Sequence, residues 1–193
     1  MILLIQYTLI FASVLSLVAL GGCFSEHSGV INLGLEGVMV MGALGGALAM
    51  KSLGGANKLL IILVVLLVSA VSGMLYTVLL GFACINFKAD QTLVGTAMNI
   101  LATAAATVIV KALNMAENSA NVSSTVQYGA AKKAFTIRMK NLGNFEFNWF
   151  MLVALLALIL AAVVLYRTRF GLRLMACGEN PQAADSVGIN VYR

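Results

Sequence analysis

The sequence predicts an all-α fold, a polytopic bundle of about five membrane-spanning helices. Its 193 residues are 61% hydrophobic and only 10% charged, with a mean hydropathy of +0.99, whereas soluble domains carry about 25% charged residues. The apolar residues also gather into runs of the length that crosses a bilayer, about 20 residues each. The bilayer must therefore solvate most of the folded surface, and helices satisfy the backbone polar groups there.

The apolar runs give the predicted spans in order. The first and third runs are almost uniformly apolar, and the second is rich in glycine and interrupted by Asn32 and Glu36. The fourth contains Asn99, and the fifth is bracketed by Trp149 and Tyr166, as is typical of aromatic residues at a membrane interface. We treat the chain, residues 1–193, as one transmembrane domain with spans at residues 2–23, 30–50, 59–85, 92–113 and 149–166.

Two polar segments complete the chain. Residues 114–148 are rich in Asn, Ser, Lys and Gly and predict a long loop. Residues 167–193 include a short predicted helix, because Asn180 can cap free amides and Pro181 suits the first helical position. Gly188 is placed to end that helix in the left-handed conformation. Two interpretations stay open, a surface that docks on a cytoplasmic partner and a helix lying on anionic headgroups.

The most informative segment begins the second span. A carboxylate at lipid depth costs roughly 2.5–3.5 kcal/mol on insertion scales, so Glu36 should face a cavity or a partner. On a continuous helix Asn32 and Glu36 would share a face, and Gly34 and Gly37 permit a bend or close backbone approach. The segment therefore predicts a pathway lining. A structural interhelical bond for Glu36 and a cap role for Asn32 remain alternatives.

The fourth span offers a second set of polar side chains. Gln91, Asn99 and Thr103 recur at helical spacing and would line the same cavity as Glu36, or serve as packing contacts between helices. Small residues spaced as in Gly42-x-x-x-Gly46 predict plain helix packing.

Several classes of function are disfavoured. The formal net charge is +5, but Lys and Arg lie in loops rather than on one face, which argues against a nucleic-acid surface. The three cysteines lack CxxC spacing and His27 is the only histidine, so no metal site is expected. There is no phosphate-binding Gly-x-x-x-x-Gly-Lys loop and no nucleophile elbow. We expect a chain that is not an enzyme and has no ATPase site of its own.

Charge counting leaves the membrane orientation open. With five spans, residues 114–148 and the tail lie on opposite sides. Seven Lys and Arg residues fall on the first side and five on the tail side, where Arg167, Arg169 and Arg173 form the densest group close to a span. The positive-inside rule weights such short, dense clusters, so the count decides nothing.

Three sequence blocks carry a resemblance to a known family. FSEHSGVINLGLEG (residues 24–37), KADQTLVGTAMN (88–99) and the tail with GENPQAAD (178–185) occur in order. Together they resemble the membrane permeases of bacterial ATP-binding-cassette importers, the branch that takes up nucleosides, simple sugars and branched-chain amino acids. The forms NLGLEG and GENPxAAD point most to the nucleoside and simple-sugar subgroup.

This resemblance implies a type II importer-like bundle in the bacterial inner membrane that forms a translocation pathway by alternating access. It implies an external loop at 114–148 and a cytoplasmic coupling region at 167–193. The implied partners are ATPase subunits that use ATP and Mg, a second permease subunit, an extracytoplasmic solute-binding protein and the lipid bilayer, with no nucleic acid. The implied pathway residues are Asn32, Gly34, Glu36, Gly37, Gln91, Asn99 and Thr103. The implied coupling residues are Arg173, Gly178, Glu179, Asn180, Pro181, Ala183, Ala184, Asp185 and Gly188.

The chain departs from the family in one respect, since family members continue past the coupling loop with further spans. We expect that the chain is either C-terminally incomplete or naturally short. Two other classes of function therefore stay open: a non-transporting scaffold or remnant of a permease, and an ion-coupled carrier that works without ATP. The solute, and whether the second permease subunit is identical, are also left open.

Overall fold

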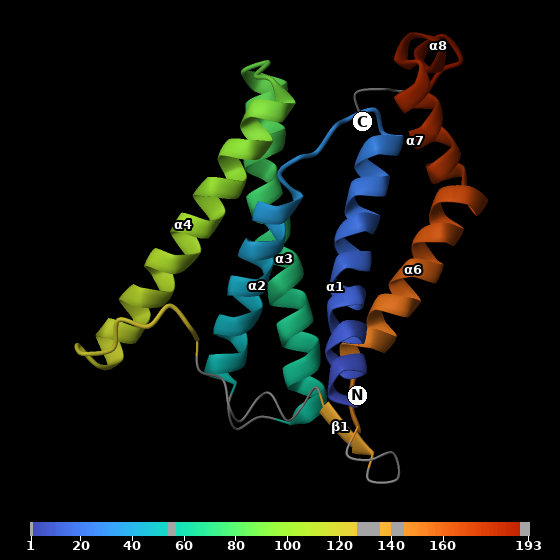
Figure 1. The fold of residues 1–193 in the computed structure, drawn as a ribbon. Coiled ribbons are helices and arrows are strands. Elements are labelled where there is room, and N and C mark those ends of the chain that lie inside the picture. Colours follow the sequence, from blue (N-terminus) through green and yellow to red (C-terminus); the bar gives the residue numbers. More distant parts are fainter. Residues whose placement is uncertain (1, 54–56, 127–135, 140–144, 190–193) are drawn as a thin grey trace. The chain divides into compact units, whose positions relative to one another are not determined.

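The computed structural model describes residues 2–53, 57–126, 136–139 and 145–189 (Figure 1). The chain forms two compact units, one of residues 1–32 and 138–193 and the other of residues 33–137. We call them the α1–α6 unit and the α2–α4 unit, and each is described by itself.

The α2–α4 unit consists of three helices, α2 (Leu35–Ser52), α3 (Lys58–Asn86) and α4 (Gln91–Glu117). Helix α2 packs on both of the others. Its small residues let α3 approach closely, and the Ser69 hydroxyl donates a 2.9 Å hydrogen bond to the Gly42 carbonyl oxygen. A Cβ at Gly45 would collide with Ser72. The glycine spacing of α2 is thus a packing surface, as predicted.

Helix directions in this unit follow from contacts at both ends of α2. Near its start Gly37 lies against Asn99, and near its end Lys51 pairs with Glu117, so α2 and α4 run parallel. Gly46 contacts Val65 while the earlier Val38 contacts Gly73, so α2 and α3 run antiparallel.

The α1–α6 unit is built on α1 (Ile2–His27) and α6 (Trp149–Arg167), followed by α7 (Arg169–Glu179) and α8 (Pro181–Ser186). Strands β1 (Thr136–Met139) and β2 (Phe145–Asn148) pair ahead of α6. Helices α1 and α6 are parallel neighbours (Figure 1). The rings of His27 and Tyr166, at their final turns, meet edge to face with centroids 6.5 Å apart, and β2 lies against α1.

The all-α membrane bundle is confirmed. Each of the five predicted spans contains a helix, and α1, α3, α4 and α6 are long and apolar enough to cross a bilayer, judged over the described residues. The 18-residue α2 is not among these four, because its apolar stretch is rich in glycine and has Glu36 and Lys51 near its ends.

The structure corrects three local predictions. Residues 30–34 are not helical and α2 begins at Leu35, so Asn32 and Glu36 do not share a face of one continuous helix. The predicted 114–148 loop includes the last turn of α4 and both strands. The tail holds a second helix, α7, whose start is capped by the Thr168 hydroxyl, which accepts from the Gly171 N–H at 3.3 Å.

Candidate functional site: the start of α2 and the α7–α8 region

The first turn of α2 is capped by a different helix. Its own N-cap residue, Gly34, has no side chain to offer. The Asn99 side chain of α4 supplies two hydrogen bonds here: its Oδ1 accepts from the Gly37 N–H at 2.7 Å, and its Nδ2 donates to the Leu33 carbonyl oxygen at 2.9 Å. The free N–H groups of a helix start need such an acceptor where water is scarce. Asn99 therefore fixes the position at which α2 begins.

Two glycines allow this contact by bringing backbones together. A Cβ at Gly37 would lie 3.0 Å from the Met98 carbonyl oxygen and 3.1 Å from Asn99 Oδ1. A Cβ at Gly95 would lie 2.9 Å from the Gly34 nitrogen and 3.1 Å from the Leu33 carbonyl carbon. Backbone atoms cannot move aside as a side-chain end can, so any larger residue at Gly95 displaces the start of α2.

This helix start lies inside the bundle rather than at its rim. Asn99 is about 12 Å along α4 from Gln91, at about 1.5 Å per residue. The same level is braced by the buried Tyr76 of α3, whose hydroxyl donates a 2.6 Å hydrogen bond to the Met98 carbonyl oxygen. The non-helical chain before Leu35 thus lies against α4 about two turns from the start of that helix, and such backbone is tolerated at membrane depth where it is buried in protein or lines a cavity.

The remaining predicted pathway residues take different places. Glu36 is exposed in the first turn of α2, where a carboxylate is favoured by the helix dipole. Thr103 is exposed on α4 and its hydroxyl bonds to its own helix, at the carbonyl oxygens of Asn99 and Ile100. Gln91 is half-buried at the first position of α4, and the half-buried Asn32 belongs to the α1–α6 unit. Gly34, Gly37 and Asn99 are the predicted residues that the α2–α4 unit brings together.

A wide-open cavity of about 330 Å³ lies farther along the same pair of helices. It opens between α2 and α4, and Thr107, one turn beyond Thr103, is on its wall. Its lining is mostly apolar, with three hydroxyl groups. The lining residues are Val40, Ala43, Leu44, Ala47, Ala106, Thr107, Val110, Ser124, Thr125 and Val126.

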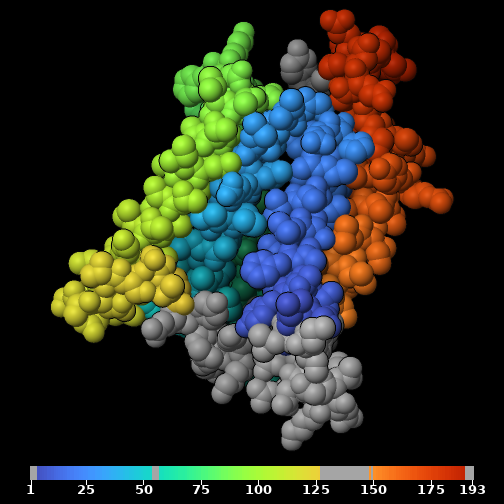
Figure 2. Space-filling model, in the orientation of Figure 1, coloured from blue at the N-terminus to red at the C-terminus, as the bar shows by residue number. Residues whose placement is uncertain are grey.

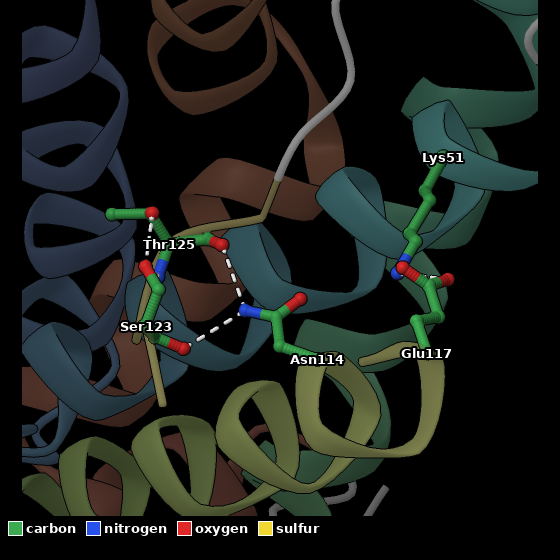
Figure 3. A network of polar contacts seen from close by, with 5 residues as sticks. All are labelled: Lys51, Asn114, Glu117, Ser123 and Thr125. Carbon is green, nitrogen blue, oxygen red and sulfur yellow. Dashed lines mark hydrogen bonds and ion pairs between the residues drawn. The ribbon is translucent and has the colours of Figure 1, made fainter. Parts of the chain in front are cut away.

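Polar contacts hold the segment after α4, which lines this cavity, against the end of that helix (Figure 3). The amide of the buried Asn114 donates to the carbonyl oxygens of Ser123 at 2.8 Å and Thr125 at 3.0 Å. Lys51 of α2 forms a 2.7 Å ion pair with Glu117 of α4. As Figure 2 shows, the segment after α4 lies against the end of that helix. The network fixes one wall of the cavity to α4.

The second predicted site lies in the α1–α6 unit, where α7 and α8 are joined by one residue. The Asn180 N–H donates to the Ala176 carbonyl oxygen at 3.2 Å and closes α7. The Asn180 side chain accepts from the Ala183 N–H at 3.1 Å and opens α8, with Pro181 in the first turn. Gly188 has φ of +82° after the last turn. The predicted N-cap residue, the proline at the start and the glycine at the end of this helix are therefore present.

Helix α8 carries mostly small side chains, and most of them are exposed. Ala184 is its buried residue, 3% exposed, and α8 packs against α7. Pro181, Ala183 and Asp185 are exposed, and so is Val187, which is 78% exposed. Arg173 and Glu179 of α7 are also exposed, while Gly178 is half-buried. Seven of the nine predicted coupling residues are thus exposed, while Ala184 is buried and Gly178 half-buried.

Sequence reasoning missed several residues that build these sites. Gly95 and Tyr76 position the start of α2, and Asn114 fixes the chain after α4. Only Thr168, a capping residue followed by a helical pattern, carried a local signal that would have revealed α7.

Comparison with known proteins gives the site its context. The family described as the permease component of branched-chain amino acid transport systems matches residues 4–193. The chain is 37% identical to the guanosine ABC transporter permease protein NupQ of Bacillus subtilis, over 99% of this chain and 60% of that protein. It is 33% identical to the nucleoside ABC transporter permease protein NupC of Lactococcus lactis, over 98% of this chain and 60% of that protein.

A third relative is named for a sugar. The putative glucose ABC transporter permease protein TsgC13 of Haloferax volcanii is 29% identical, over 98% of this chain and 56% of that protein. The chain thus spans about 60% or less of the length of these curated relatives. No solved structure matches the chain significantly.

Proposed function

Because the chain belongs to the family of permease components of branched-chain amino acid transport systems, we propose that it forms the translocation pathway of an ATP-driven nucleoside importer. The match over residues 4–193 supports the role as a permease, and two relatives named for guanosine and nucleosides support the solute class. The family consists of transport components, and the chain is a multi-pass protein of the inner membrane. Substrate, partners and the energy source remain parts of the proposal.

The crossing pattern supports a role for α2 as a full span. Helices α1 and α6 run in the same direction. The chain from the end of α1 to the start of α6 must therefore cross the bilayer an odd number of times. Helices α3 and α4 supply two crossings, and α2 supplies the third. The 18 residues of α2 cover about 27 Å of the roughly 30 Å core, and the non-helical chain before Leu35 completes the crossing.

The start of α2 is the proposed part of the pathway that meets solute. A helix that begins at membrane depth presents backbone polar groups and the Glu36 carboxylate where a polar solute needs partners. Gly34, Gly37 and Asn99 hold this start in place, and Thr103 continues the polar surface along α4. Gln91 is assigned to the approach to it, and Asn32 precedes it in the sequence.

The exposed surface of α7 and α8 is the proposed contact for an ATPase subunit. In this proposal α8 is cytoplasmic, β2 and the start of α6 face outside, and a solute-binding protein delivers solute on that outer side. ATP and Mg act in the partner ATPase, and a second permease subunit completes the pathway. ATP binding changes the contacts at α8, and that difference between two states drives alternating access.

We assign nucleosides as the solute class because two relatives are named for guanosine and nucleosides, at 37% and 33% identity. The relative named for glucose is more distant at 29% identity. A neutral nucleoside also suits the cavity between α2 and α4, whose wall combines apolar side chains with the hydroxyls of Thr107, Ser124 and Thr125.

Uptake of labelled guanosine by cells carrying the full-length gene and its ATPase tests the proposal. We expect uptake that ceases on ATP depletion, persists when the proton gradient is collapsed, and is competed by unlabelled nucleosides but not by glucose. Glu36→Gln should reduce uptake while the ATPase still co-purifies. Deletion of residues 178–190 should remove the ATPase from the purified complex.

Each alternative gives its own result. Uptake that follows the proton gradient and survives ATP depletion identifies an ion-coupled carrier. Membrane insertion with no ATPase association and no uptake identifies a scaffold. Competition by glucose alone reassigns the solute class.

A further inference from the structure

The ends of α1 and α7 meet backbone to backbone. A Cβ at Gly178 would collide with the His27 carbonyl oxygen and lie 2.9 Å from the Gly29 nitrogen. A Cβ at Gly29 would in turn lie 3.1 Å from both the Cα and the carbonyl oxygen of Gly178. Gly29 also has φ of +78°, which disfavours other residues. Two glycines therefore face each other, with no side chain between the helix ends.

The chain on the α1 side of this contact is tightly closed. The Ser25 hydroxyl donates to the Val30 carbonyl oxygen at 2.7 Å, and the Val30 N–H donates to the Ser25 carbonyl oxygen at 3.2 Å. The Gly29 N–H donates to the Glu26 carbonyl oxygen at 3.0 Å. The turn after α1 thus moves with α1 and not as a free loop.

The chain on the α7 side also contains no loop, because a single residue connects α7 to α8. Asn180 ends α7 and begins α8 with one residue and two capping hydrogen bonds. At the other end of α7, a Cβ at Gly171 would collide with the Leu165 carbonyl oxygen, so α7 also sits directly on the end of α6. From α8 to Val30 every connection is a capped helix, a closed turn or a backbone contact.

We propose that Gly178 and Gly29 form a joint that makes α8, α7 and the end of α1 move as one body, which the chain after Val30 tethers to the start of α2. Residues 31–33 link Val30 covalently to Gly34, and a link this short reaches at most about 14 Å. A displacement of α8 that carries Val30 beyond this reach must therefore move the helix start that Asn99 holds. This inference rests on the proposed function and assigns Gly178 and Gly29 as positioning residues for coupling.

The test separates transport from ATP hydrolysis in the full-length complex reconstituted in proteoliposomes. In Gly178→Ala and Gly29→Ala the added methyl group forces apart the backbones that meet at the joint. We expect ATPase association and basal hydrolysis within about twofold of the parent, and nucleoside uptake per ATP hydrolysed lower by roughly tenfold or more, the size of typical coupling between sites. Gly81→Ala is the control, because a Cβ there meets nothing within 4 Å.

A second variant keeps every contact of the joint intact. Insertion of Gly-Ser between Glu179 and Asn180 leaves α8 its cap but makes the connection between α7 and α8 flexible. This variant tests the proposal even if a glycine substitution fails to fold. The same loss of uptake per ATP is expected. Unchanged coupling in this insertion, or in a well-folded Gly178→Ala complex, overturns the proposal.

Hydrogen exchange distinguishes failure of the joint from failure of the proposed function. ATPase binding should alter amide exchange in residues 28–33 of the parent and should not do so in the insertion variant. A parent complex without ATP-driven uptake contradicts the proposed function. A parent that transports but shows the same exchange in residues 28–33 with and without ATPase contradicts the joint alone.

Discussion

The starts of α2 and α8 are held in opposite ways. Helix α8 is capped by the residue next to it, Asn180, with Pro181 in its first turn. Helix α2 begins after a glycine, and its cap comes from Asn99, 62 positions away from Gly37 in sequence. A locally capped helix keeps its form when its surroundings move. A helix capped from another element changes when that element moves, which suits a start that meets solute in one state and releases it in the other.

The largest effect should follow from breaking the close approach at the start of α2. Gly95→Leu places a side chain against the Gly34 and Leu33 backbone, with the first carbon 2.9 Å from the Gly34 nitrogen. We expect a loss of about 3 kcal/mol in the free energy of unfolding, measured by SDS titration in mixed micelles. Gly81→Leu is the matched control in open space on α3. Equal losses in both variants would show that α2 does not depend on this contact.

The next effect comes from removing the cap itself. Asn99→Ala leaves the Gly37 N–H and the Leu33 carbonyl oxygen without their partner, which costs about 2 kcal/mol. Thr103→Val, one turn along α4, is the control, because that hydroxyl bonds only to its own helix. The same titration measures both. The cap assignment fails if Thr103→Val costs as much as Asn99→Ala.

The same contrast explains what the sequence could predict. Asn180, Pro181 and Gly188 act on their own neighbours, so the ends of α8 were correctly placed from local residue preferences. The spans were predicted because lipid selects long apolar runs wherever they pack. The start of α2 was placed too early, because Val30 and Ile31 continue an apolar pattern while the contacts of Gly34 and Gly37 with α4 decide where the helix begins.

The two helices of the tail give a further example. Helix α7 was missed although Thr168 caps it, because one residue, Asn180, separates it from α8 and leaves no loop to mark its end. The contacts of Gly178 with His27 and Gly29 join segments far apart in sequence, and no local pattern encodes them. Roles in the pathway and in coupling remain predictions that the uptake experiments address.

A smaller and strictly local effect is expected at the start of α8. Asn180→Ala removes the side-chain acceptor of the Ala183 N–H and should destabilise α8 by about 1 kcal/mol. The rest of the bundle should be unaffected, since the cap serves only that helix. Amide exchange should rise in residues 183–186 and stay unchanged around Gly37. Asn180→Ser, which keeps an acceptor, should restore protection, and faster exchange at Gly37 would contradict the local character of this cap.

The smallest effect is expected for the ion pair at the far end of α2. Lys51 and Glu117 lie 2.7 Å apart, but their side chains are 25% and 64% exposed, so water and salt weaken the attraction. A double-mutant cycle with Lys51→Met and Glu117→Gln should give a coupling energy of about 0.2–1 kcal/mol that shrinks as salt is raised. A coupling as large as the Asn99 effect would mean that α2 is held as firmly at its end as at its start. In that case α2 would be clamped at both ends, and its start would lose the freedom that distinguishes it from a fixed span.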